Sequence, residues 1–199
     1  MSHTSEDYCR SCRNKPGPVR AQIRGKHQNM HSEQIIIDSV LALWKSTVDR
    51  ATRLFDDLSE EDAAEPVAPG RNRVVYLLGH LTAVHDRMIP LLGLGERVHP
   101  EMDASFVSNP DRAIGDLPPL ADLKSRWENV NGHLLVPMQQ DVSPSWWAQR
   151  HTSVSEADFQ INPTRNRLSI LLNRTNHLSY HLGQIVLAPK RPSGSADRK

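Results

Sequence analysis

The chain has 199 residues, of which 38% are hydrophobic and 24% are charged, and its formal net charge at pH 7 is +1. This length fits one domain with a sizeable core, and the near-neutral charge gives no general argument for nucleic-acid binding. No apolar run reaches the roughly 18 residues of a membrane span, no secretory signal lies near the start, and two cysteines are too few for a disulfide scaffold. We therefore expect a cytoplasmic location and no membrane partner.

Both ends of the sequence differ in composition from its centre. Residues 1–31 carry six Lys/Arg against two acidic residues, contain few large apolar residues and include the turn-forming segment 15–18. We predict a disordered basic leader over residues 1–31, an ordered domain over residues 32–190 and a polar tail over residues 191–199. Met30 is a candidate start of the natural chain, because the ordered pattern begins directly after it.

Four amphipathic helices are predicted in residues 32–190. The second spans about residues 71–89 and ends or kinks at Pro90, the third spans 118–137, and the fourth spans 164–188 from a Thr164 cap. The first follows a Ser32 cap, and its apolar residues recur at spacings of three and four. These residues are Ile36, Val40, Trp44, Val48, Ala51, Leu54 and Leu58.

Two long connections join the last three predicted helices, over residues 95–118 and 138–163. Loops of this length are usually functional or mobile. The pair Trp146-Trp147 could line a hydrophobic mouth, but we favour a plug at the end of the helices. Alternation typical of a strand occurs only locally, around residues 154–161. The fold class predicted from these elements is all-α, a four-helix bundle with long crossover connections.

Two histidines mark the predicted fourth helix. His177 and His181 are four residues apart in the apolar run 168–187, so both imidazoles lie on one helix face. Neutral imidazole is a good ligand for zinc, nickel, copper and iron. His80, in the apolar run 74–88, is a third candidate ligand, and three histidines from two helices leave a coordination position open, as in catalytic metal sites.

The second nitrogen of each ring also needs a partner. His177 and His181 extend a polar line at intervals of four that begins with Ser169 and Asn173, and Gln184 lies three residues further on. Asn173, Gln184 and Tyr180 are therefore candidates to support the ligands. His85 lies about 140° around the helix from His80, and we expect it at the surface or rim.

A simpler interpretation needs no metal. The motif H-x-x-x-H is common, and such a pair can be partly exposed or bonded to water on a helix flank. His80 would then be a hydrogen-bonded core residue. Three core-facing histidines in one small domain favour the metal site, because each unpaired polar group would cost ~1–3 kcal/mol.

Two segments carry a family resemblance. Residues 76–81 (YLLGHL) and residues 177–185 (HLSYHLGQI), the second similar to the ending H-x-x-x-H-x-G-Q-[IV], resemble the DinB-like (YfiT-type) superfamily of metal-binding four-helix-bundle proteins. By helix order the resemblance covers about residues 32–190. It implies an up-up-down-down bundle with a long crossover, a divalent metal on His80, His177 and His181, and a homodimer.

The resemblance also implies a class of activity. Some members are thiol transferases that use bacillithiol, mycothiol or glutathione, and others are described as metal-dependent hydrolases. Such a metal, zinc or nickel, lowers the pKa of a bound water toward ~7 or binds a thiol as thiolate. We therefore expect a thiol S-transferase, with a low-molecular-weight thiol as second cofactor, or a hydrolase, acting on a small-molecule substrate. The residues that bind the thiol vary in the superfamily, so none carries over.

Two other functions stay open at this point. The domain could bind metal without catalysis, as a sensor or stress-response module. The leader could form a zinc finger, since Cys9-x-x-Cys12 and His27-x-x-x-His31 have a spacing near that of a Cys2His2 finger. The segment between these pairs contains Pro-Gly-Pro and lacks the aromatic and leucine core of a finger, so we expect no nucleic-acid partner.

Overall fold

The computed structural model describes residues 18–113, 115–140 and 143–189, and this part of the chain contains helices and no strand. The all-α class is therefore confirmed. No described helix is both long enough and apolar enough to span a bilayer. Cys9, Cys12 and the predicted tail over residues 191–199 lie outside the described residues.

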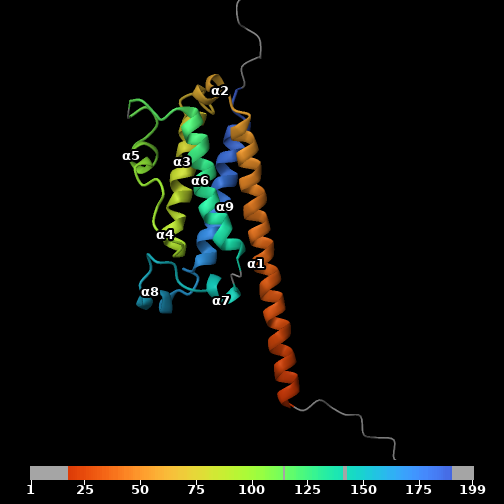
Figure 1. Ribbon diagram of the computed structural model, residues 1–199. Helices are drawn as coiled ribbons and strands as arrows, with labels where there is room; N and C mark the ends of the chain where they lie inside the picture. Colours follow the sequence, from red (N-terminus) through yellow and green to blue (C-terminus); the bar gives the residue numbers. More distant parts are fainter. Residues whose placement is uncertain (1–17, 114, 141–142, 190–199) are drawn as a thin grey trace, which may run out of the picture.

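Four long helices form the core: α1 (Pro18–Asp56), α3 (Val74–Asp86), α6 (Leu120–Gln139) and α9 (Arg167–Val186). α1 packs against α6 and α9, and α3 packs against the same two helices (Figure 1). α3 and α9, the two helices that carry the candidate histidines, are therefore direct neighbours.

Five short helices lie in the connections: α2 (Glu60–Ala64), α4 (Met88–Leu92), α5 (Met102–Phe106), α7 (Pro144–Trp147) and α8 (Glu156–Ile161). The segment with strand-like alternation thus forms a helix, α8. In α7, Trp147 is fully buried, and the Arg167 guanidinium lies 4.1 Å from the centroid of the Trp146 ring. Trp147 belongs to the core, which agrees with a plug.

The long helices run up, down, down and up. The end of α1, the start of α3 and the end of α9 meet around one hollow, and Lys124 near the start of α6 donates to the Asp56 (3.0 Å) and Leu58 (2.9 Å) carbonyls there. α1 and α9 therefore end where α3 and α6 begin, as Figure 1 shows. The order up-up-down-down implied by the family resemblance is wrong, because the segment after α4 crosses the length of the molecule and makes α3 and α6 parallel.

A buried carboxylate holds the start of this crossing segment. Asp86, at the end of α3, is fully buried and accepts hydrogen bonds from Arg97 Nε (2.9 Å) and from the backbone N–H groups of Val98 (2.8 Å) and His99 (3.1 Å). Arg97 also pairs with Asp103 at 2.6 Å, and this contact holds the pKa of the Asp103 carboxyl at about 2. Charge pairs of this kind fix α5 against α3.

The second end of the crossing segment is held in the same way. Asp111 accepts from Arg73 through the backbone N–H (2.8 Å) and through the guanidinium (2.7 Å to Nη2). The Asp111 carboxylate side chain is only 2% exposed. Since Arg73 is the N-cap residue of α3, both ends of that helix are tied to the segment that follows it.

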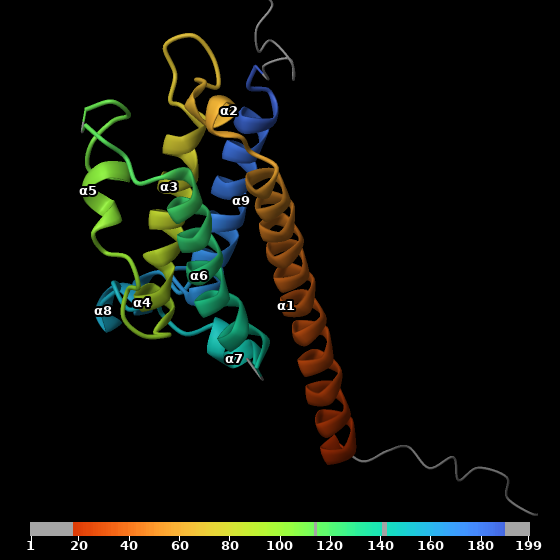
Figure 2. The ribbon, with the colours of Figure 1, turned by 45° about the horizontal axis from the view of Figure 1, so that its top comes forward.

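Helix boundaries differ from the predicted ones. α1 begins at Pro18, so residues 18–31, which we expected in a disordered leader, are helical, and Ser32 lies inside the helix. Proline is tolerated in a first helical turn, and no further proline interrupts the chain up to Asp56. Figure 1 and Figure 2 show that the beginning of α1 extends beyond the other helices.

Two other helix boundaries also differ from the predicted ones. The predicted helix over residues 71–89 divides at Arg87 into α3 and α4, ahead of Pro90, which lacks a backbone donor. The cap of α9 is Asn166 instead of Thr164, and its side chain accepts from the Ser169 N–H at 2.9 Å.

The expectation for His85 is wrong. This ring is fully buried between Trp44 (4.8 Å between ring centroids) and Trp127 (4.9 Å), and its Nδ1 is 2.9 Å from Asn131 Oδ1. The rotation of about 140° from His80 carries His85 to the side of α3 that faces α1 and α6, instead of to solvent. Burial lowers the pKa of His85 to about 3.

This burial predicts a pH-dependent stability. The unfolded chain, with a histidine pKa near 6.5, binds a proton that the folded chain does not bind until about pH 3. The contribution of His85 to stability is therefore complete above pH 6.5 and is lost as the pH falls, by about 2 kcal/mol between pH 7 and pH 5.

Urea unfolding of the metal-free protein at pH 7, 6 and 5 measures this loss. His85→Gln should remove that part of the pH dependence, whereas His133→Gln, at an exposed position of α6, should retain it. Equal pH dependence in the wild-type protein and His85→Gln would contradict the assignment.

Candidate metal centre

The three histidines singled out from the sequence come together between α3 and α9. His80 Nε2 lies 3.3 Å from His177 Nε2, which lies 3.1 Å from His181 Nε2. One nitrogen from each ring can be chosen so that all three lie within 4.8 Å of one another. All three side chains are partly buried.

Hydrogen bonds fix the protonation of two of these rings. His80 Nδ1 lies 2.7 Å from the carbonyl oxygen of Phe106, which can only accept, so Nδ1–H is the donor and Nε2 of the neutral ring carries a lone pair. His181 Nδ1–H donates to Gln184 Oε1 at 2.7 Å, and Gln184 Nε2 donates to the Tyr180 hydroxyl at 3.1 Å. Two lone pairs therefore face His177.

His177 cannot donate a full hydrogen bond to both of these lone pairs. If its Nε2 carries a proton, that proton is shared between two acceptors; if its Nδ1 carries the proton instead, three lone pairs converge. Its Nδ1 is buried and has no hydrogen-bond partner among the described residues. A cation between the three Nε2 atoms would accept all three lone pairs, and zinc ligands at 2.0–2.1 Å in a tetrahedron are about 3.3 Å apart. The donor set and its spacing therefore fit a divalent transition metal.

The electrostatics keep these rings neutral. Burial is the first cause that lowers the pKa of His80, His177 and His181. The pKa of His177 falls to about 4, since His181, His80 and Arg174 add to the effect of burial. At pH 7 the three imidazoles are in the uncharged form that binds metals.

The carbonyl that orients His80 depends on a neighbouring glycine. A Cβ at residue 79 would overlap the ring of Phe106, so only glycine allows α5 to approach α3 this closely. Tyr76 supports the same contact, because its hydroxyl donates to the Asn109 carbonyl at 2.8 Å and its ring stacks on His80. Sequence reasoning missed Phe106; the signal was Gly79, a glycine inside a helix next to a candidate ligand.

The supporting residues expected from the sequence divide into two groups. Gln184 contacts His181 directly and Tyr180 contacts Gln184. Asn173 is exposed and forms no hydrogen bond to the three histidines among the described contacts. Ser169, at the start of the polar line, donates from its hydroxyl to the carbonyl of the cap residue Asn166 at 2.7 Å and is not in contact with the three histidines among the described contacts.

A hollow of about 280 Å³ lies beside His181 and is open to solvent. α9 contributes Tyr180, His181 and Gln184 to its lining, α3 contributes Leu77, and the turn before α3 contributes Arg71 among others. A small molecule in this hollow would contact the ring of one candidate ligand.

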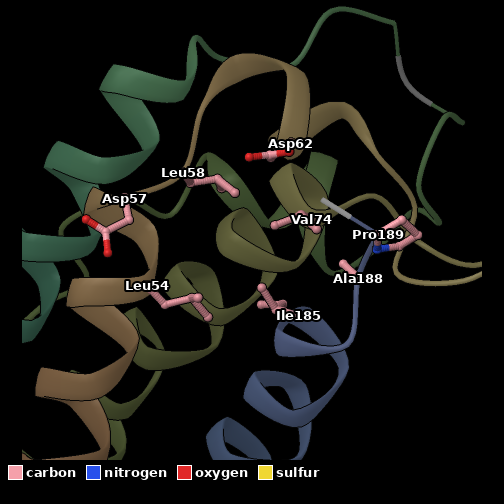
Figure 3. A pocket seen from close by; sticks show the side chains of 8 residues that line it. All are labelled: Leu54, Asp57, Leu58, Asp62, Val74, Ile185, Ala188 and Pro189. Atoms are coloured by element: carbon pink, nitrogen blue, oxygen red, sulfur yellow. The ribbon is translucent and has the colours of Figure 1, made fainter. Parts of the chain in front are cut away.

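A second hollow lies at the end of the molecule where α9 terminates (Figure 3). Its lining is mostly apolar, and the side chains of Asp57 and Asp62 lie apart from each other at its edge. None of the three histidines lines this hollow, so it is separate from the candidate metal centre. Its apolar residues are Leu54, Leu58, Val74, Ile185, Ala188 and Pro189.

Two glycines near the centre give a matched test of its geometry. Gly79→Ala should lower stability by about 1–3 kcal/mol and weaken metal affinity, because the new methyl group displaces Phe106 from His80. Gly183→Ala should raise stability by roughly 0.5–1 kcal/mol, since a Cβ there meets open space and alanine is the better helix former.

Thermal unfolding and metal titration of both variants measure these effects. If Gly79→Ala behaved like Gly183→Ala, the close approach of α5 would not position His80.

A comparison with protein-family models finds no family that matches this chain. A comparison with curated proteins finds no similar protein. The function is therefore argued from the geometry of the site.

Proposed function

We propose that this protein is a metal-dependent enzyme in which His80, His177 and His181 hold a divalent transition metal, zinc or nickel. The reaction is the activation of a small nucleophile, a thiol or water, for transfer to or hydrolysis of a small molecule. The four long helices form a four-helix bundle of the DinB-like type, in which α3 and α9 present the ligands.

The observation that carries this proposal is the convergence of three Nε2 atoms at 3.1 and 3.3 Å. Two of them are acceptors by their own hydrogen bonds to Phe106 and Gln184. An arrangement of three acceptors without a cation is unfavourable in a partly buried site, since unpaired polar groups there cost ~1–3 kcal/mol.

A catalytic role is favoured over a structural one by the number and setting of the ligands. Structural zinc sites use four protein ligands, whereas catalytic sites use three and leave a position open. In the described part of the chain, the metal-ligating cluster contains the three histidines and no carboxylate or thiol. The hollow beside His181 leaves room for a small molecule next to this cluster.

When bound, the metal would supply a positive charge that lowers the pKa of a water or thiol. The protein's own residues keep the ligands in place for this role. Phe106 holds the Nδ1 side of His80, and Gln184 holds the Nδ1 side of His181. Such partners fix the ring orientation and the protonated nitrogen, and their loss typically weakens metal affinity about 10- to 100-fold.

The first test is metal content. Protein purified without a histidine tag should contain about one zinc or nickel ion per chain, and His177→Ala should lose it because two ligands are not enough. Removal of the metal by a chelator should lower stability by about 4 kcal/mol when the free metal had been at a thousand times its dissociation constant. Elemental analysis and thermal unfolding measure the two effects.

The matched control is His133→Ala, since His133 is exposed on α6 and donates only to the Asn129 carbonyl at 2.9 Å. That variant should keep its metal. A fully metallated His177→Ala protein would refute the site. Metal-loaded protein is then screened with thiols against epoxides, halides and conjugated alkenes, and with hydrolysable esters, to identify the reaction.

A further inference from the structure

One cation next to the metal centre has no counter-charge. Arg174 lies on α9 three residues before His177, so the two side chains lie on the same side of the helix. Its guanidinium forms no ion pair or hydrogen bond within the part of the chain that the structure describes, and its Nε atom is fully enclosed. An enclosed N–H without an acceptor is costly, so this group calls for an explanation.

The neighbouring acidic side chains do not pair with Arg174, because they pair with other arginines. Arg87 pairs with Asp103 at 2.7 Å, and Arg97 pairs with both Asp86 and Asp103. These two arginines and two aspartates balance one another. The charge of Arg174 is left over, and it acts on the site, because it contributes to the lowered pKa of His80 and His177.

A second arginine of α9 shows what a protein-bound guanidinium looks like in this helix. Arg167 lies over the Trp146 ring at 4.1 Å and donates to Gln149 Oε1 at 3.0 Å. The Nε of Arg167 is also enclosed and unpaired, but the rest of its guanidinium is held by a ring and an acceptor of the protein. Among the described residues, Arg174 has no such acceptor and no such ring contact.

We propose that Arg174 binds an oxyanion, a carboxylate or phosphate group, of the small molecule that reacts at the three-histidine centre. The inference rests on the proposed function, and it names the substrate class. An oxygen of this group accepts from the Nη groups of Arg174, which, unlike Nε, are not enclosed by the protein.

The charge balance supports an anion. Three neutral imidazoles leave the full charge of a divalent ion in place, and Arg174 adds one more positive charge. No carboxylate belongs to the metal-ligating cluster in the described residues. A reactant with a carboxylate or phosphate group next to its reacting atom would offset this excess, and a neutral one would not.

The test uses the full chain loaded with Co²⁺, whose visible absorption reports both occupancy and changes at the metal. Acetate and inorganic phosphate are titrated separately and followed by absorption and by calorimetry. Both should bind to the wild-type protein, and the tighter of the two identifies the oxyanion. Arg174→Gln should weaken the binding about 10- to 100-fold, as expected for a charge-assisted hydrogen bond.

Two further variants make the result specific. Arg174→Lys keeps the charge without the planar pair of donors and should give an intermediate affinity. Arg50→Gln removes an exposed arginine of α1, away from α3 and the three histidines in the sequence, and should leave anion affinity unchanged. Equal anion affinity in the wild-type protein and Arg174→Gln, or an equal loss in Arg50→Gln and Arg174→Gln, would overturn the inference.

Cobalt uptake separates this inference from the proposed function. Uptake that depends on His80, His177 and His181, together with anion affinity that is independent of Arg174, overturns only the role of Arg174. Absence of uptake by the wild-type protein, or equal uptake when all three histidines are replaced, overturns both. Full cobalt occupancy in Arg174→Gln shows that this variant is folded.

Discussion

The hydrogen bond from His80 Nδ1–H to the Phe106 carbonyl is the contact on which the candidate centre depends. It joins α3 to the segment that crosses the molecule, and it makes His80 Nε2 an acceptor. The contact requires that α5 lies close to α3, which Gly79 permits and the buried Asp86 carboxylate enforces through Arg97. Because α3 and α6 are parallel, a long segment must cross the molecule between them. The same segment carries the Phe106 carbonyl that orients His80.

The three neutral histidines are held together at a cost in free energy. Burial disfavours their protonated forms, and two of their Nε2 lone pairs face a third ring that has one proton to offer. In a folded protein such conflicts are rare, because buried polar groups are almost always paired. Metal binding would remove the conflict and stabilise the fold at the same time, so the affinity for metal and the stability of the protein are linked.

The sequence was enough to predict which histidines come together but not their surroundings. Spacing by four places His177 and His181 on one face whatever the rest of the chain does, and the apolar neighbours of His80 direct it inward. Helix geometry gives the angle between His80 and His85, yet it does not say which faces are covered, and α3 is covered by α6, α9 and α5 together. The Phe106 carbonyl is a backbone group 26 residues from His80; Gly79 signals a close approach to the helix, but no pattern in the sequence says which segment approaches.

The pattern of polar residues at intervals of four along α9 did not select Arg174. The intervals of four select Asn173, which is exposed, whereas the next residue reaches the side of α9 on which His177 lies. A helix has 3.6 residues per turn, so a strict interval of four drifts around the axis, and residues at intervals of three lie on its other flank. On that flank the protein places a guanidinium with no carboxylate to pair with it. A permanent cation retained beside three neutral imidazoles is unfavourable for a site that binds a metal alone, since like charges repel. It is favourable for a site that binds a metal together with an anion, which is the arrangement proposed for Arg174 and the three histidines.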